Sequence, residues 1–85
     1  MTNEEILNKM YDEFRAEGYN VDMYSDGSLW VWKKSGYNVV AYDMDDHIEM
    51  NICEKGDPVD TDCWKNKQLV KTASGIRIYT KRHLS

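Results

Sequence analysis

Four residues of the 85-residue chain have side chains that most often bind metals or act as nucleophiles. They are Cys53, Cys63, His47 and His83. Structural zinc needs four nitrogen or sulfur ligands, which normally come as two closely spaced pairs, and the sequence contains no such pair. No general base stands beside either cysteine. We therefore expect reduced thiols, two solvated histidines and no metal, although a thiol or metal enzyme that uses Cys53 or Cys63 is a third hypothesis.

Carboxylates are the other groups that could do chemistry. They form two clusters: Asp43, Asp45, Asp46 and Glu49 around a predicted hairpin tip, and Asp57, Asp60 and Asp62 in the loop that follows. A catalytic acid/base pair needs a concave, partly dry site, for which a chain with one small core offers little room. The second cluster lacks the ligand spacing of an EF-hand. With no G-x-S-x-G elbow and no glycine-rich phosphate loop either, the sequence indicates a protein without catalytic activity or cofactor.

A helix is predicted over about residues 2–17. Thr2 and Glu5 form a capping box, in which each side chain satisfies a free backbone N–H of the first turn. Apolar residues recur at helical spacing from Ile6 to Phe14. Gly18 is a typical C-terminal cap.

After Gly18 the apolar period changes to two, which predicts a four-stranded antiparallel meander over about residues 20–53. The expected strands are 20–24, 29–34, 37–44 and 47–53. They are joined by two-residue turns at Asp26-Gly27, Ser35-Gly36 and Asp45-Asp46. These turns place one apolar face together: Val21, Met23, Trp30, Trp32, Val39, Ala41, Ile48, Met50 and Ile52. A register slip of one residue would move these side chains to opposite faces, so the agreement of the three turns supports this register. The N-terminal helix is expected to lie across the apolar face.

The opposite face of the meander is predicted to carry an apolar stripe. Its residues are Tyr24, Leu29, Val31, Val40 and Tyr42. Contiguous apolar patches usually mark an interface. We expect the stripe to be covered by residues 63–85, by a protein partner, or by a second copy of the chain in a homodimer.

The last third of the chain is predicted to be a loop at 54–62 and a C-terminal β-hairpin at about 68–81. The hairpin strands are 69–72 and 76–80, joined through Ala73-Ser74-Gly75. A short helix near residues 62–68 is the alternative. The predicted fold is thus a single α+β domain, residues 1–85, with an N-terminal helix packed on one face of a four-stranded antiparallel meander, followed by a basic hairpin.

Charge is divided unevenly along the chain. All fifteen acidic residues and five basic ones lie in residues 1–62, for a net charge of −10, whereas residues 63–85 hold six basic residues and no acid. These six, with Trp64 and Tyr79 nearby, are Lys65, Lys67, Lys71, Arg77, Lys81 and Arg82. Basic and aromatic residues together are typical of single-strand nucleic-acid binding. Because the acidic remainder would repel a polyanion, a nucleic-acid-binding or regulatory domain is the alternative hypothesis.

The first hypothesis is a small acidic module that binds a protein. Carboxylates on an ordered surface can dock onto a basic groove that normally holds phosphates. In size, acidity and lack of catalytic motifs the chain resembles accessory proteins of phages and mobile elements that inhibit host nucleic-acid-binding proteins or nucleases, including anti-CRISPR proteins; this resemblance is one of type, without a shared motif.

The expected location is the cytoplasm, with no membrane partner. No stretch approaches the roughly 20 apolar residues that span a bilayer. Residues 1–5 lack the basic and apolar regions of a secretory signal.

Overall fold

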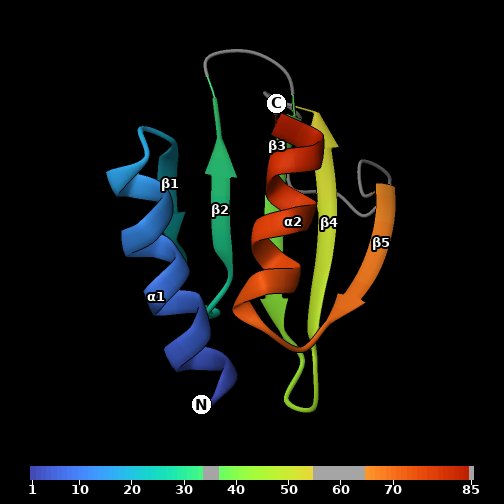
Figure 1. The fold of residues 1–85 in the computed structure, drawn as a ribbon. Helices are drawn as coiled ribbons and strands as arrows, with labels where there is room; N and C mark the ends of the chain where they lie inside the picture. The colour runs from blue at the N-terminus through green and yellow to red at the C-terminus, as the bar shows by residue number, and fades with distance from the viewer. Residues whose placement is uncertain (34–36, 55–64, 85) are drawn as a thin grey trace.

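The computed structural model describes residues 1–33, 37–54 and 65–84. Its elements, in chain order, are α1 (Asn3–Ala16), β1 (Asn20–Met23), β2 (Leu29–Trp32), β3 (Tyr37–Asp43), β4 (Ile48–Glu54), β5 (Lys65–Val70) and α2 (Ala73–Leu84). The five strands form one antiparallel sheet in the order β1-β2-β3-β4-β5. Both helices lie on the same face of this sheet (Figure 1). The α+β class with an antiparallel sheet is therefore confirmed.

Helix α1 begins and ends where its capping residues indicate. Thr2 accepts a hydrogen bond from the Glu5 N–H at 3.2 Å, and the Glu5 carboxylate accepts one from the Thr2 N–H at 3.0 Å. At the other end Gly18 has a positive φ of 95°, and the Tyr19 N–H donates to the Phe14 carbonyl at 3.0 Å. The Tyr19 and Phe14 rings meet edge to face, which is the apolar contact that accompanies such a cap.

The loop between β1 and β2 is one residue longer than predicted. The Tyr24 N–H donates to the Ser28 carbonyl, and the Gly27 N–H donates to the Tyr24 carbonyl, both at 2.9 Å. Residues 25–27 therefore form a three-residue hairpin loop, with Gly27 at a φ of 85° in its left-handed position. The Asp26 carboxylate stabilises this loop by accepting hydrogen bonds from the Ser28 N–H at 2.9 Å and the Ser28 hydroxyl at 2.6 Å.

Strand β2 is consequently turned over relative to the prediction. Val21 pairs with Val31 rather than with Trp32, and β2 is shifted by one residue against β3 as well. Two such shifts exchange the faces of β2 alone, because successive side chains of a strand point to opposite faces. Leu29 and Val31 therefore lie in the core, each 1% exposed. The predicted place of Trp30 and Trp32 on the helix-covered face is wrong, although Trp30 is buried on the opposite face.

The pairing of β3 with β4 is as predicted. Ala41 lies opposite Met50, and the Met44 N–H donates to the His47 carbonyl at 3.0 Å across the two-residue turn Asp45-Asp46. Asp45 takes the left-handed conformation this turn requires, with a φ of 74°.

The predicted C-terminal hairpin of strands 69–72 and 76–80 does not form. Strand β5 pairs with β4, but residues 73–84 form helix α2 where a strand at 76–80 was expected, and residues 65–68 are strand where the alternative placed a helix. The Thr72 hydroxyl caps α2 by accepting a hydrogen bond from the Gly75 N–H at 3.1 Å. The buried residues of α2 share one helix face: Ile76, Tyr79, Thr80 and Leu84. Ile78, which alternates with Ile76 as in a strand, is 56% exposed.

The core lies between the sheet and the two helices. Its buried residues are Ile6, Leu7, Met10 and Phe14 of α1, the inward side chains of β2–β5, and Ile76, Tyr79 and Leu84 of α2. Two ion pairs join the helices at the surface. Arg77 forms a two-pronged pair with Glu13, at 2.7 and 2.9 Å, and Lys81 lies 3.0 Å from Glu17.

Candidate functional site

Three segments that are distant in sequence meet at one end of the molecule: the start of α1, the β1–β2 loop and the β3–β4 loop (Figure 1). We call this the acidic end and define it by the carboxylates of Glu4, Asp26, Asp43, Asp45 and Asp46. It contains two hollows. The first, of about 430 Å³, is lined by Glu4, Leu7, Asn8, residues 23–27 and Asp43. The second, of about 320 Å³, is lined by residues 1–4, Asp43 and Asp45.

Asn3 joins the start of α1 to the β3–β4 loop. Its Nδ2 lies 2.9 Å from Asp43 Oδ1, 3.0 Å from the Asp45 carbonyl and 2.9 Å from the His47 carbonyl. Asp43 Oδ1 also accepts a hydrogen bond from the Asp45 N–H at 3.0 Å. The Asn3 side chain therefore fixes the β3–β4 loop against the start of α1.

Hydrogen bonds keep three carboxylates of the acidic end charged. The Asn3 amide lowers the pKa of Asp43, and the Ser28 hydroxyl lowers the pKa of Asp26. His47, whose Nδ1 lies 2.6 Å from Asp46 Oδ1, lowers the pKa of Asp46. Since donors favour the ionised form of a carboxyl group, all three are negative at neutral pH.

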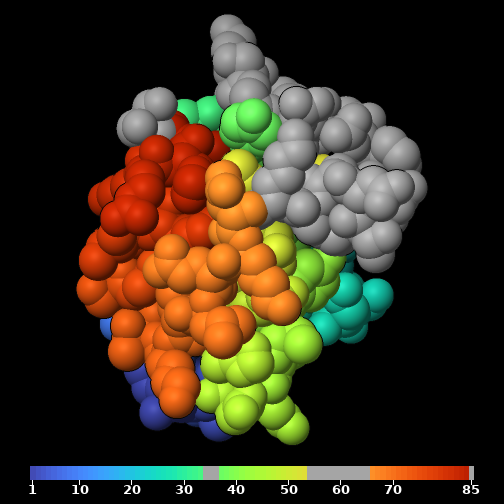
Figure 2. Space-filling model, turned by 90° about the vertical axis from the view of Figure 1, so that its right-hand side faces the viewer, coloured from blue at the N-terminus to red at the C-terminus, as the bar shows by residue number. Residues whose placement is uncertain are grey.

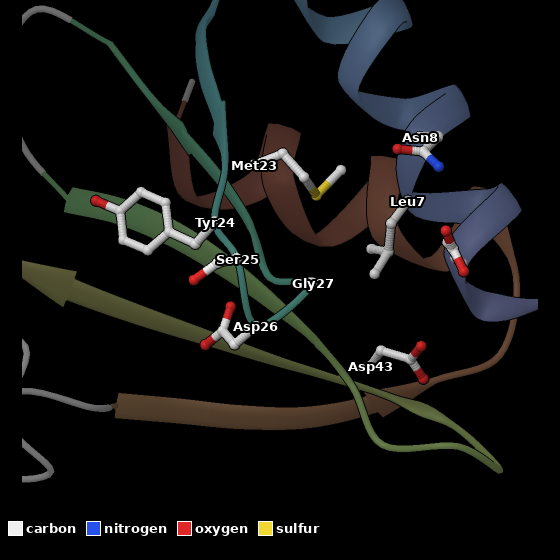
Figure 3. Close-up of a pocket in the computed structure, with 9 residues that line it drawn as sticks. Leu7, Asn8, Met23, Tyr24, Ser25, Asp26, Gly27 and Asp43 are labelled. Carbon is white, nitrogen blue, oxygen red and sulfur yellow. The ribbon is translucent and has the colours of Figure 1, made fainter.

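Two apolar residues, Leu7 and Met23, are among the residues that line the first hollow. Figure 3 shows the Leu7 and Met23 side chains extending into the space between α1 and β1, with Asp43 near the β3–β4 loop. Leu7 is buried and Met23 half-buried. No lysine, arginine or histidine is among the residues that line either hollow.

The predicted acidic residues are thus brought together only in part. Asp43, Asp45 and Asp46 lie at the acidic end, whereas Glu49 pairs with Lys67 at 3.0 Å on the neighbouring strand. Asp57, Asp60 and Asp62 lie outside the described residues. Sequence reasoning did not place Glu4 and Asp26 around one hollow with Asp43, because no local pattern relates residues so far apart in the chain.

The predicted apolar stripe does not form. Leu29 and Val31 lie on the opposite, helix-covered face, and Val40 is fully buried. Tyr42 is half-buried, and burial raises its pKa. Of the five stripe residues only Tyr24 is exposed, at 42%, and its ring stacks on Trp30 with centroids 4.8 Å apart. These five residues therefore offer no continuous apolar surface to a partner or a second copy of the chain.

The basic residues of the last third lie along β5 and α2, which are side by side in Figure 2. Three of them pair with acids: Lys67 with Glu49, Arg77 with Glu13 and Lys81 with Glu17. Lys71 and Arg82 are exposed, and the side chain of Lys65 lies outside the described residues. Much of the positive charge therefore faces the protein's own carboxylates.

The cysteine and histidine residues that the structure describes are Cys53, His47 and His83. Cys53 is disulfide-bonded, unlike the reduced thiol expected for a cytoplasmic protein; Cys63 lies outside the described residues. His47 contacts Asp46, whereas His83 packs on the Tyr79 ring at 4.4 Å, and burial lowers its pKa. Within the part of the chain that the structure describes, no group of three or more His, Cys, Asp or Glu side chains could hold a metal ion.

No protein-family model matches the chain, and no curated protein or solved structure matches it either. Among the described residues, neither helix has the length and apolar character needed to cross a membrane.

Proposed function

We propose that the protein is a small non-catalytic binding module whose acidic end docks on a basic surface of a protein partner. The observation that carries this proposal is the convergence of carboxylates from three segments around two hollows without a lining basic residue. The negative electrostatic potential of such a group of carboxylates speeds and orients association with a surface of opposite charge.

The framework under these carboxylates supports the same proposal. Asn3 and Ser28 hold Asp43 and Asp26 in place before any partner arrives, so less side-chain freedom is lost on binding. A groove that normally holds phosphates, as in a nuclease or another nucleic-acid-binding protein, has the complementary charge. An inhibitor of phage or mobile-element origin would act by occupying that groove.

The first test is capture of a partner from bacterial lysate by tagged protein, with and without nuclease, followed by mass spectrometry. The proposal expects a stoichiometric protein partner that survives nuclease treatment. Recovery that disappears with nuclease would instead favour the nucleic-acid alternative.

The second test uses two matched double variants that remove the same charge. Glu4→Gln with Asp45→Asn changes the acidic end, and asparagine tolerates the left-handed conformation of Asp45. Asp12→Asn with Asp22→Asn changes exposed acids that line neither hollow. We expect the first pair to weaken partner binding roughly three- to tenfold and to flatten its salt dependence. If the two double variants weaken partner binding equally, the acidic end has no special part in binding.

A further inference from the structure

Cys53 differs from the chemical state that its sequence context predicts. A cysteine of a cytoplasmic protein is expected to be a reduced thiol, but Cys53 is disulfide-bonded. The sequence contains one other cysteine, Cys63, and therefore offers a single bonding partner within the chain. The fold thus includes a covalent bond that the sequence analysis did not predict.

The Cys53 side chain is closed off from solvent. The residue is 1% exposed and lies in β4, opposite Asn38 of β3. Alternate residues of a strand share a face, so Cys53 lies on the same face of the sheet as Asn51 and as Val40, which pairs with Asn51. Asn51 and Val40 are also buried, and this face is the one opposite the helices. Cys53 therefore belongs to a buried patch that is separate from the core under the helices.

Burial makes both reduction and formation of this bond difficult in the folded protein. A disulfide is reduced when a thiolate attacks one of its sulfurs, and burial denies access to the Cys53 sulfur. Attack on the other sulfur would expel the Cys53 thiolate into the buried patch, where a charge is costly. A reduced Cys53 would be equally inert, because a thiol in such surroundings has a raised pKa and is a poor nucleophile.

We infer that the Cys53 disulfide is a permanent structural cross-link rather than a reversible redox switch, and that it closes while the chain folds in an oxidising compartment. The expected oxidant is a small disulfide such as oxidised glutathione. One cysteine thiolate attacks it and displaces one glutathione thiolate, and the second cysteine thiolate then displaces the other. Two protein thiols are thereby oxidised to one disulfide, and the oxidant is reduced to two thiols. The inference concerns how the fold is completed, so it does not depend on the proposed function.

The first test follows reduction of the protein by dithiothreitol in buffer and in urea. Samples are quenched with iodoacetamide, and the alkylated thiols are counted by mass spectrometry. We expect reduction in buffer to be at least about a hundredfold slower than in urea, because it requires opening of the structure around Cys53. Reduction of oxidised glutathione under the same two conditions is the control for the effect of urea on the reaction itself. Similar rates in buffer and in urea would show an accessible, switch-like bond and overturn the inference.

The second test compares two forms of the same sequence. The fully reduced chain is refolded with and without oxidised glutathione, and thermal unfolding of both products is followed. We expect the form refolded with oxidant to regain the disulfide, and the other to melt at least about 10 °C lower. Equal melting temperatures would mean that the bond is not a structural cross-link.

The third test addresses the compartment. The protein is produced in the bacterial cytoplasm, and whole cells are quenched in acid so that thiols are trapped before they meet air. We expect Cys53 to be recovered mainly as a thiol, because the cytoplasm keeps thiols reduced. Recovery of a fully formed disulfide from these cells would overturn the requirement for an oxidising compartment.

Discussion

Asn3 occupies a position where local and tertiary preferences conflict. It is the first residue of α1, where an acidic side chain would favour the positive end of the helix dipole. Its amide, however, contacts one carboxylate and two carbonyl oxygens in the β3–β4 loop. Only a donor suits those three acceptors.

We therefore expect Asn3→Asp to destabilise the protein by about 1–2 kcal/mol, despite its helix-favouring charge. The measurement is urea unfolding at neutral pH. Asn8→Asp, on the same helix, adds the same charge without those contacts and should change stability much less. Equal stability of the two variants would show that the Asn3 contacts contribute nothing.

Thr80 is a buried residue with an unsatisfied polar group. It is fully buried in α2, and in the described structure its hydroxyl has no hydrogen-bond partner. Thr80→Val keeps the shape of the side chain and removes the hydroxyl, which loses its hydrogen bonds to water on folding. The variant should therefore be more stable by about 1 kcal/mol. Thermal unfolding measures the change. Thr80→Ser, which keeps the hydroxyl and removes a methyl group, should destabilise; a destabilised Val variant would mean that the hydroxyl has a partner.

At the scale of elements, β5 and α2 approach each other closely at Gly75. A Cβ placed there would lie 2.9 Å from Val70 Cβ and 3.0 Å from its Cγ1. Alanine would gain up to about 1 kcal/mol in helix propensity. Overpacking of a tight contact costs about 1–3 kcal/mol.

Gly75→Ala should therefore destabilise by about 1 kcal/mol, the opposite of what helix propensity predicts. The matched control is Ser74→Ala, an exposed neighbour in the same turn, which should stay within about 0.5 kcal/mol of the parent. Chemical denaturation of both variants measures the change in the free energy of unfolding. A stabilised Gly75→Ala would show that Val70 gives way easily.

The two helices are coupled by the Glu13–Arg77 pair, which predicts a pH dependence. Hydrogen bonding to Arg77 lowers the pKa of Glu13 in the folded state. A carboxyl group of this kind contributes stability above its unfolded pKa, of about 4.3, and that stability is lost as the pH falls through the lower folded value. The contribution is small because both side chains are about one-third exposed.

Glu13→Gln should accordingly be less stable than the parent at neutral pH, and the difference should vanish in acid. Denaturation of both proteins across this range measures it, and a double-mutant cycle with Arg77→Met isolates the pair. A difference that persists unchanged in acid would mean that Glu13 acts through packing rather than charge.

At the scale of the whole molecule, the charge separation seen along the chain is partly cancelled by the fold. Lys67, Arg77 and Lys81 each face a carboxylate of β4 or α1. The two hollows of the acidic end have, by contrast, no lysine, arginine or histidine among their lining residues. Among the described residues, basic side chains of the last third are therefore largely paired, whereas Glu4, Asp43 and Asp45 have no basic side chain paired with them.

We expect that the protein will not be retained on heparin at physiological ionic strength, because its net charge of −4 repels the polyanion. Salt-gradient elution is the measurement. If the parent is retained and the double variant Lys71→Ala, Arg82→Ala is not, the nucleic-acid-binding hypothesis would be favoured. The binding residues would then be exposed ones of the C-terminal third.

Much of the local structure could be predicted from the sequence. The capping residues of α1 and the Asp45-Asp46 turn act over only a few residues, so the information for them is contiguous in the chain. Asp43, Asp45 and Asp46 were identified as one cluster for the same reason. The face of β2 could not be predicted, since a three-residue loop and a two-residue turn at Asp26-Gly27 have nearly the same sequence signal.

The sequence by itself thus determined the class of fold, the first helix, the β3–β4 register and the unequal distribution of charge. Only the tertiary structure decided which face of β2 is buried, that residues 73–84 are a helix, and that Glu4 and Asp26 line the same hollow as Asp43. Those outcomes depend on packing and hydrogen bonds between segments far apart in the chain, where the competing local preferences differ by too little energy to choose.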